Sequence, residues 1–254
     1  MITLQKRLPR IVELWFDQKL PTAAHADVAY LRQWNFLPVG LSANDPNTKN
    51  FSTRVIDLNQ DTDCLKKNLD SGTAYEIRRA HSKDDLVCEL LLEPTPQDLE
   101  RFVTFYNAFA QSKGLQLAPL DQMQARFRAG ALHLSVASHK GEVVVWHCYI
   151  GAAHRARLLY SASSFRDSED TAYRAMVGRA NRALHWFDIL EYKKLQCAWY
   201  DFGGWYTGTN DEQLLGINRF KQSFGGTVVV EYNAVIAISL LGRLKFRLAK
   251  WRSN

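Results

Sequence analysis

The stretch of residues 200–226, YDFGGWYTGTNDEQLLGINRFKQSFGG, decides how the whole chain is interpreted. Asp201-Phe202-Gly203-Gly204 closes a predicted strand, and FKQSFGG ends a predicted helix and starts the next strand. Paired glycines let the backbone adopt positive φ angles or approach a ligand closely. The segment therefore predicts a strand, a helix and a strand around a functional site; a plain turn and a helix cap are the alternative.

Length and composition indicate a globular protein. The 254 residues are 46% hydrophobic, which is enough for one large domain or for one domain and part of another. No apolar run is long enough to span a membrane or act as a signal peptide, so we expect a cytoplasmic protein. The four cysteines lie far apart without metal-ligand spacing, which predicts no zinc site. Walker, Rossmann, serine-elbow and zincin motifs are absent from the sequence.

Positive charge is concentrated at the carboxyl end. The formal net charge is +6, and five basic residues fall within 243–252, with no acidic residue after position 239. The remaining chain is close to neutral, which argues against a duplex nucleic acid as partner. Leu240, Leu241, Leu244, Leu248 and Trp251 share a helical face. This tail, 241–254, predicts a basic amphipathic helix that lies on an anionic membrane surface through residues 240–252 or packs on the protein itself.

Outward from the opening stretch, elements follow one another at regular spacing. Strand-like runs at 10–17 and 51–58 and a helix at 61–69 precede residue 84. From there the patterns predict strands at 86–92, 131–138, 142–150, 155–163, 195–201, 227–232 and 234–240, with helices opened by Thr95 and Pro119 and others at 169–192 and 211–223. The expected order is β-α-α-β-β-β-α-β-α-β-β, an α/β class with a mixed sheet.

This order resembles the GNAT acyltransferase fold, in which two neighbouring strands splay apart to admit an acyl donor. YDFGG, a helix and FKQSFGG look like the carboxyl half of the Fem family, the GNAT-related aminoacyltransferases of peptidoglycan cross-bridges, and like related acyltransferases of surface polysaccharides. The blocks RVIDL and IRRA fit the same group. Fem proteins contain two full halves, so we expect residues 1–82 to form a partial half-domain packed on a GNAT-like domain at 83–240.

The resemblance implies an N-acyltransferase that joins an acyl or aminoacyl unit to an amine of an amino sugar or other cell-envelope precursor. No bound cofactor is expected; acyl-CoA and aminoacyl-tRNA are the alternative donor substrates. A GNAT enzyme that uses coenzyme A holds its pyrophosphate with a glycine-rich turn. Here that turn is 161–167, SASSFRD, and it contains no glycine. We assign donor binding to Tyr160, Ser161, Ser163 and Arg166.

Lys221 is the first catalytic candidate. The resemblance implies that the lysine of FKQSFGG faces the ligand cleft, where an ammonium would neutralise a phosphate or a carbonyl oxygen. A solvated helix-end lysine is the alternative. Asp201 closes the strand beside the cleft and is a candidate to accept a proton, or it caps the turn at Gly203 and Gly204.

Tyr206 and His147 complete the predicted catalytic set. Tyr206 is placed to protonate a leaving group, although tyrosines in such loops more often pack and make one hydrogen bond. His147 lies within the strand VVVWHCYI, and its near-neutral pKa suits a general base; a core histidine is the alternative.

An anionic acceptor is expected at Arg78 and Arg79, with Gly203, Gly204 and Phe220 also placed at the acceptor site. No serine or cysteine has a recognisable activating partner, which predicts direct attack in a ternary complex without an acyl-enzyme. A non-catalytic module that binds an anionic envelope precursor, or docks on a membrane-bound synthase, is the competing hypothesis. The sequence defines no oligomeric state.

Overall fold

The computed structural model describes residues 1–152, 154–165 and 168–244. The chain divides into two compact units. The smaller unit contains residues 1–53, 121–129 and the described residues from 229 onward, and the larger unit contains residues 54–120 and 130–228. The units are defined by which residues lie close together in space. The predicted domain boundaries at residues 82 and 240 stay predictions. Residues 245–252 of the predicted tail helix lie outside the described residues.

The smaller unit consists of strands, the helix α4 (Leu120–Arg128) and a helical turn at residues 240–244. Its strands are β1 (Ile2–Gln5), β2 (Ile11–Trp15), β3 (Val28–Trp34) and most of β10 (Thr227–Ala237). β2 runs parallel to β3, whereas β1 is antiparallel to β2 and β10 is antiparallel to β3. Glu13 of β2, fully buried, accepts hydrogen bonds from Arg126 of α4 at 3.0 Å. This ion pair attaches α4 to the strands of its unit.

The larger unit carries the mixed sheet. The strand order is β4 (Thr48–Asp57), β9 (Trp199–Gly204), β8 (Arg155–Ser163), β7 (Glu142–Ala152), β6 (Leu132–His139) and β5 (Leu86–Leu91), with residues of β4 divided between the units. β5 to β8 are antiparallel neighbours, and β8 and β9 are parallel. The helices are α1 (Thr62–Lys67), α2 (Ser71–Lys83), α3 (Pro96–Lys113), α5 (Thr171–Lys194) and α6 (Glu212–Gln222).

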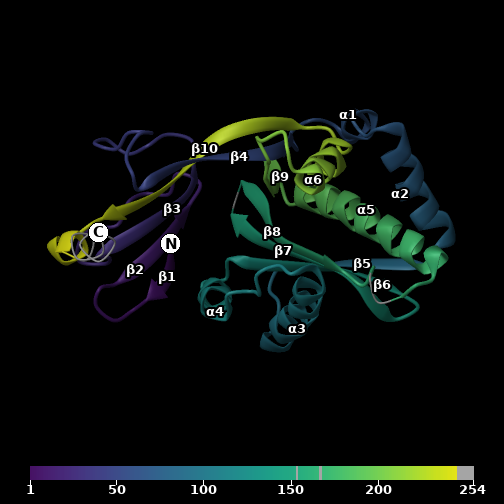
Figure 1. The fold of residues 1–254 in the computed structure, drawn as a ribbon, viewed down its shortest axis with the longest axis horizontal. Coiled ribbons are helices and arrows are strands. Elements are labelled where there is room, and N and C mark those ends of the chain that lie inside the picture. Colours follow the sequence, from purple (N-terminus) through teal and green to yellow (C-terminus); the bar gives the residue numbers. More distant parts are fainter. Residues whose placement is uncertain (153, 166–167, 245–254) are drawn as a thin grey trace. The chain divides into compact units, whose positions relative to one another are not determined.

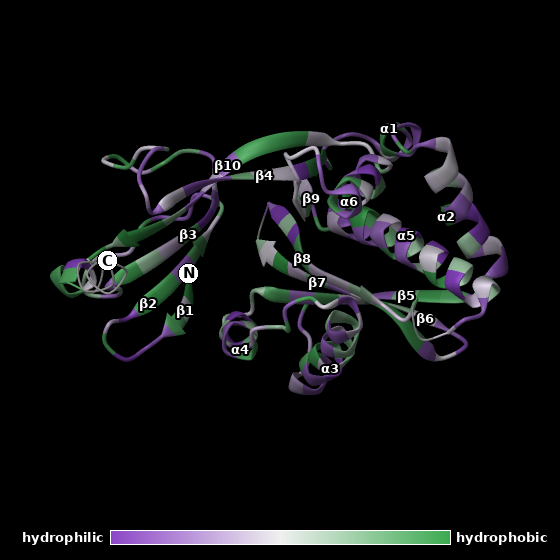
Figure 2. Cartoon of the chain, in the orientation of Figure 1, coloured by the Kyte–Doolittle hydropathy of each residue, from purple (hydrophilic) through white to green (hydrophobic). Residues whose placement is uncertain are grey.

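Helices cover both faces of this sheet. α5 packs along β5 to β8 on one face, with α2 beside it, and α3 lies against β7 and β8 on the other (Figure 1). Bands of hydrophobic and hydrophilic residues alternate along α3 and α5 in Figure 2, as expected for helices that bury one side. The buried face of α5 includes Val177, Ala180, Leu184 and Ile189. The predicted α/β fold class with a mixed sheet is therefore confirmed.

Local sequence signals account for most element boundaries. Asp61, Thr95 and Asp211 cap their helices through side-chain oxygens, and Thr95 forms a capping box with Asp98. The strands β5, β6, β7 and β8 begin within one residue of their predicted starts.

Other predictions of secondary structure were wrong. The basic residues around Arg78 lie on α2, a helix capped by Asp70 that was not predicted, and neither β1 nor β3 was predicted. The strand predicted at 195–201 begins only at Trp199, because α5 extends to Lys194. The two strands predicted at 227–232 and 234–240 are one strand, β10, whose register shifts between Tyr232 and Ala234.

None of the described helices combines the length and apolar composition that a membrane-spanning segment requires.

The second glycine pair, Gly225 and Gly226, lies in close contact with the backbone of β4. Gly225 and Gly226 have φ angles of 84° and 76°, and their carbonyls accept hydrogen bonds from Arg54 at 2.7 and 2.9 Å. A Cβ on Gly226 would lie 2.3 Å from the carbonyl oxygen of Val55. These glycines therefore let α6 end directly against β4.

We expect Gly226→Ala to lower the free energy of unfolding by at least about 2 kcal/mol, because a left-handed residue and a backbone clash are imposed together. Gly178→Ala in α5 is the matched control, since its Cβ meets no atom within 4 Å. This control should be neutral or raise stability by about 0.5–1 kcal/mol. Urea unfolding of both variants measures the difference, and equal effects would contradict the interpretation.

Candidate functional site

The parallel strands β8 and β9 pair over only part of their length. Their ladder consists of Arg155 with Trp199, Ala156 with Tyr200, and Arg157 with Asp201. β8 continues to Ser163 and β9 to Gly204 without further pairing between these described residues. Gly203, at φ 73°, lies where they part, and a Cβ there would lie 2.9 Å from the Leu158 carbonyl oxygen. The splayed strand pair expected from the motifs is therefore present.

A cavity of about 520 Å³ opens beside the unpaired part of β8. Its walls come from the end of α3, β8, α5, β9 and α6. The lining residues are Phe109, Lys113, Leu115, Leu158, Ser161, Ala162, Ser163, Asn181, His185, Phe202, Gln213, Leu214, Gly216, Ile217, Phe220 and Lys221. Two of these described residues are cationic and none is acidic, so the cavity suits a ligand with both apolar and anionic parts.

Lys221 is held at the cavity by the end of β9. Its Nζ donates to the carbonyl oxygens of Gly204 and, at 3.4 Å, Gly203. Burial lowers the pKa of Lys221 to about 8, and the nearby positive charge of Arg157 acts in the same direction. The ammonium is therefore fixed in position and weakly solvated, which strengthens its interaction with an anion.

Asp201 faces away from this cavity. It is fully buried, its Oδ2 accepts from Arg155 at 2.7 and 3.1 Å, and its Oδ1 accepts from the Gly203 N–H at 2.7 Å. The carboxylate thus neutralises a buried guanidinium and caps the turn that ends β9. These contacts correspond to the structural alternative considered for Asp201, and its predicted role in proton transfer stays a prediction.

His147 lies in the core behind the cavity wall. Its Nδ1 is 2.8 Å from Asp188 Oδ2, its Nε2 is 2.9 Å from Asn181 Oδ1, and the residue has no exposed surface. It is not one of the residues that line the cavity, although Asn181 and His185 connect it to that wall. Asn181 and His185 therefore lie between His147 and the cavity, and the role of His147 as a general base stays a prediction.

Tyr206, in the loop after β9, is held by two hydrogen bonds between its backbone and the Asn218 side chain. Asn218 of α6 accepts from the Tyr206 N–H at 3.1 Å and donates to its carbonyl at 2.7 Å. The phenol folds back on Gly208, where a Cβ would lie 2.3 Å from its hydroxyl oxygen. Tyr206 is not among the lining residues, whereas Phe220 is, with its ring 5.4 Å from that of His185.

The predicted donor-binding residues separate into two faces of β8. Ser161 and Ser163 line the cavity. Tyr160 points to the opposite face, where its ring packs 4.8 Å from that of Tyr106 in α3. Arg166 lies outside the described residues. The structure therefore brings Ser161, Ser163, Phe220 and Lys221 together and leaves Tyr160 in the packing of α3.

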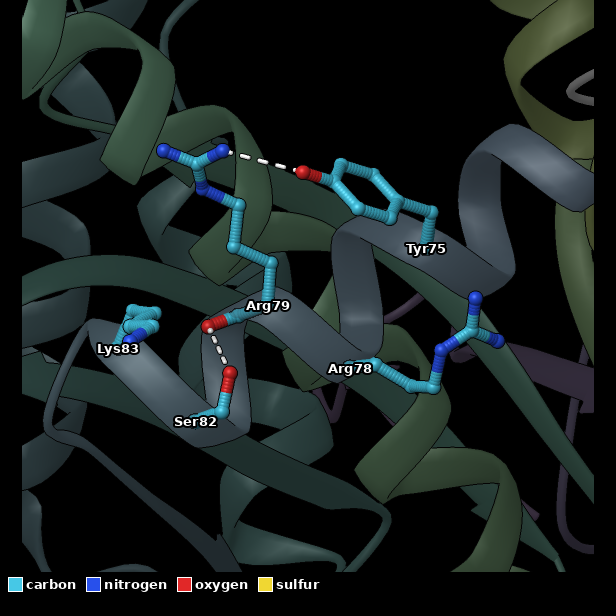
Figure 3. Close-up of a pocket in the computed structure, with 5 residues that line it drawn as sticks. All are labelled: Tyr75, Arg78, Arg79, Ser82 and Lys83. Atoms are coloured by element: carbon cyan, nitrogen blue, oxygen red, sulfur yellow. Dashed lines mark hydrogen bonds between the residues drawn. The ribbon is translucent and has the colours of Figure 1, made fainter.

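Arg78 and Arg79 lie on α2, at a second and more open hollow of about 420 Å³ lined by Tyr75, Arg78, Arg79, Ser82 and Lys83. Figure 3 shows the two arginines leaving the helix in different directions, with Arg79 Nη1 donating to the Tyr75 hydroxyl at 3.1 Å. None of these five residues lines the cavity beside β8. Acceptor binding by the arginine pair stays a prediction.

Two cavity residues were missed at the sequence level. Asn181 and His185 lie four residues apart on α5, and Asp188 follows three residues later on the same face. A polar stripe of this spacing on a helix with an otherwise apolar buried side is the signal that could have identified them.

The comparisons with known proteins agree with this geometry. No protein-family model matches the chain, and the search of curated proteins found no significantly similar sequence. Among solved structures, FemX superimposes with a TM-score of 0.59 at 11% identity, over 89% of this chain and 75% of FemX. L-PGS from Bacillus licheniformis gives a TM-score of 0.52 at 14% identity, over 89% and 74% of the two chains.

A third similar structure is the C-terminal domain of an Agrobacterium fabrum protein assigned as a lysylphosphatidylglycerol synthetase. Its TM-score is 0.50 at 12% identity, over 89% of this chain and 72% of that domain. Identities this low show the fold alone. The chain therefore has a Fem-like fold, as its motifs indicated.

We expect Asp201→Asn to act mainly on stability, since it removes the negative charge that pairs at 2.7 Å with the buried Arg155 guanidinium. Loss of one member of a buried pair costs about 3–5 kcal/mol. Glu212→Gln is the matched control, because that carboxylate is 82% exposed in its pair with Arg219, and an exposed pair contributes about 0–1 kcal/mol. Thermal and urea unfolding measure both variants. An Asp201→Asn protein as stable as the wild type would contradict this assignment.

Proposed function

We propose that the chain is an acyltransferase that moves an acyl or aminoacyl group from a thioester or ester donor to an amine by direct attack. One observation supports this most: the Lys221 ammonium is fixed at a mainly apolar cavity, beside the length of β8 that has separated from β9. That arrangement combines a space for an acyl carbonyl with a cation beside it.

The chemistry requires stabilisation of a negative oxygen. When an amine attacks the acyl carbonyl, charge develops on the carbonyl oxygen as the new N–C bond forms. Lys221 would neutralise that charge, and the backbone of β8 beyond Arg157, where its ladder with β9 ends, would supply further N–H donors. The apolar wall formed by Leu158, Phe202 and Phe220 would exclude water from a bound acyl group, which would strengthen these interactions.

Acyl-CoA and aminoacyl-tRNA are the candidate donors, and each contains phosphates that two cavity lysines and the Ser161 and Ser163 hydroxyls would suit. The fold likeness to FemX and to a protein assigned as a lysylphosphatidylglycerol synthetase supports the aminoacyl alternative. As acceptor we propose an amino sugar or another amine of a cell-envelope precursor. Arg78 and Arg79 are proposed contacts for an anionic part of that acceptor.

A position at the inner face of the membrane would suit a lipid-carried acceptor. Leu240 and Leu244, at the start of the tail, are 80% and 52% exposed. The tail sequence through residue 252 adds five basic residues, each worth about 1 kcal/mol near anionic lipid. We propose that this segment holds the protein at the membrane surface.

Lys221→Ala should lower kcat/KM by about 10²–10³, the usual cost of losing one oxyanion-stabilising donor. Thiol release from acetyl-CoA, or tRNA release from aminoacyl-tRNA, with a panel of amino sugars measures turnover. Arg219→Ala is the control, because it removes an exposed cation from the same helix outside the cavity. Absence of turnover with every donor, together with unchanged ligand binding in Lys221→Ala, would favour the non-catalytic binding module.

The activity should also depend on pH through Lys221. Its pKa is lowered to about 8 in the folded protein, so the ammonium that stabilises the oxyanion is lost as the pH rises through that value. The ratio of wild-type to Lys221→Arg rates should therefore fall above about pH 8, because a guanidinium stays charged. Taking the ratio cancels the titration of the amine substrate. A ratio that stays flat or rises across this range would contradict an electrostatic role.

A further inference from the structure

A buried polar network lies directly behind the cavity. Asp188 Oδ2 accepts hydrogen bonds from Ser135 at 2.9 Å, from His147 Nδ1 at 2.8 Å and from the Tyr149 hydroxyl at 2.6 Å. Asp188, His147 and Tyr149 are completely buried. Asp188 Oδ1 is buried and has no hydrogen-bond partner among the described residues. The three donors therefore all converge on Oδ2 of the carboxylate, which constrains the hydrogen-bond directions around it.

These constraints determine which nitrogen of His185 carries a proton. The Tyr149 hydroxyl has one hydrogen and gives it to Asp188, so at the 2.9 Å contact between the two tyrosines Tyr200 must donate to Tyr149. Tyr200 then has no hydrogen left for His185, whose Nδ1 lies 2.7 Å from the Tyr200 oxygen. His185 Nδ1 must therefore be the donor.

His185 is a neutral imidazole in this environment. Burial lowers the pKa of His185 well below its usual value, and the positive charges of Lys221 and Arg182 act in the same direction. A neutral imidazole protonated at Nδ1 carries a lone pair at Nε2. Nε2 makes no hydrogen bond to a described residue, and His185 lines the cavity that Lys221 also lines.

We infer that His185 is the general base of the transfer reaction, with its Nε2 facing the amine that attacks the donor. This inference rests on the proposed function. Tyr200, Tyr149 and Asp188 act through His185 as positioning residues, because their chain of hydrogen bonds fixes the tautomer. The logic is that of a histidine oriented by a carboxylate, here extended through two tyrosines.

The proton balance of the step is complete within the cavity. The amine nitrogen forms a bond to the acyl carbon, the carbonyl π electrons move to oxygen, and the attacking nitrogen becomes positively charged. His185 Nε2 accepts a proton from that nitrogen, which is far more acidic than a free ammonium. The intermediate then expels the donor thiolate or alkoxide, and His185 returns the proton to it.

The tautomer can be tested without any substrate. A long-range ¹H–¹⁵N spectrum of the ligand-free protein should show His185 protonated at Nδ1 and unprotonated at Nε2. Tyr200→Phe removes the acceptor for Nδ1 and should release the tautomer into a mixture. A wild-type spectrum with the proton on Nε2 would overturn the inference, whatever donor the protein uses.

The role of the base is tested with His185→Asn. The asparagine amide replaces the Nδ1 donor to Tyr200 but offers no group at Nε2, so kcat should fall by about 10²–10⁴ with KM for the donor unchanged. Added imidazole should restore part of the rate, which it would not do for a merely structural defect. His133→Asn is the matched control, because His133 is a partly buried histidine 3.1 Å from the Tyr192 hydroxyl that does not line the cavity.

The results separate this inference from the proposed function. Turnover of acetyl-CoA or aminoacyl-tRNA that is equal in wild type and His185→Asn overturns the base and leaves the acyltransferase intact. Turnover that falls in His185→Asn but not in His133→Asn, and that recovers with imidazole, supports both. Absence of wild-type turnover with either donor overturns both.

Discussion

The candidate site depends on the point at which β8 and β9 stop pairing. Up to Arg157 and Asp201 the two strands form an ordinary parallel ladder. Gly203 then adopts a positive φ angle against the Leu158 carbonyl, a position with no room for a side chain. Separation of two central strands exposes backbone groups inside a protein, which is costly unless those groups find other partners. The surrounding residues supply hydrogen-bond partners for these backbone groups.

The backbone groups at the carboxyl end of β9 have specific side-chain partners. The Asp201 carboxylate accepts the Gly203 N–H, and Lys221 donates to the carbonyls of Gly203 and Gly204. Arg54 similarly binds the carbonyls of Gly225 and Gly226, where α6 ends. One lysine thus closes a strand and leaves its charge at a cavity, so its structural and proposed catalytic functions share one geometry. Asp201 is directed away from the cavity because its carboxylate accepts the Gly203 N–H.

The sequence allowed the larger unit to be predicted well because its signals are local. Thr95 and Asp211 mark helix starts through capping, which does not depend on the rest of the fold. Gly225 and Gly226 mark the end of α6 through their positive φ angles. The predictions failed where tertiary contacts decide. Val28–Trp34 is a strand because it pairs with β2 and β10. The polar Asn233 made β10 look like two strands, but it lies at a register shift where β3 has one extra residue, and its side chain accepts the Gln33 N–H at 2.9 Å. α2 was missed because its polar sequence has few apolar positions, and its stability comes from packing along α5.

The cavity residues divide in the same way. Lys221 was identified because it stands within a motif, whereas Asn181 and His185 stand in a helix whose pattern is that of ordinary core packing. Only the fold reveals that their face of α5 lies against the part of β8 that has separated from β9, and that His147 and Tyr149 meet Asp188 behind them. Apolar side chains would fill the same volume at a lower cost in free energy, because a buried polar group destabilises the fold unless it forms hydrogen bonds. The hydrogen-bond directions in this network are constrained, so they assign the proton of His185 to Nδ1 and its lone pair to Nε2. Packing alone does not require such an arrangement.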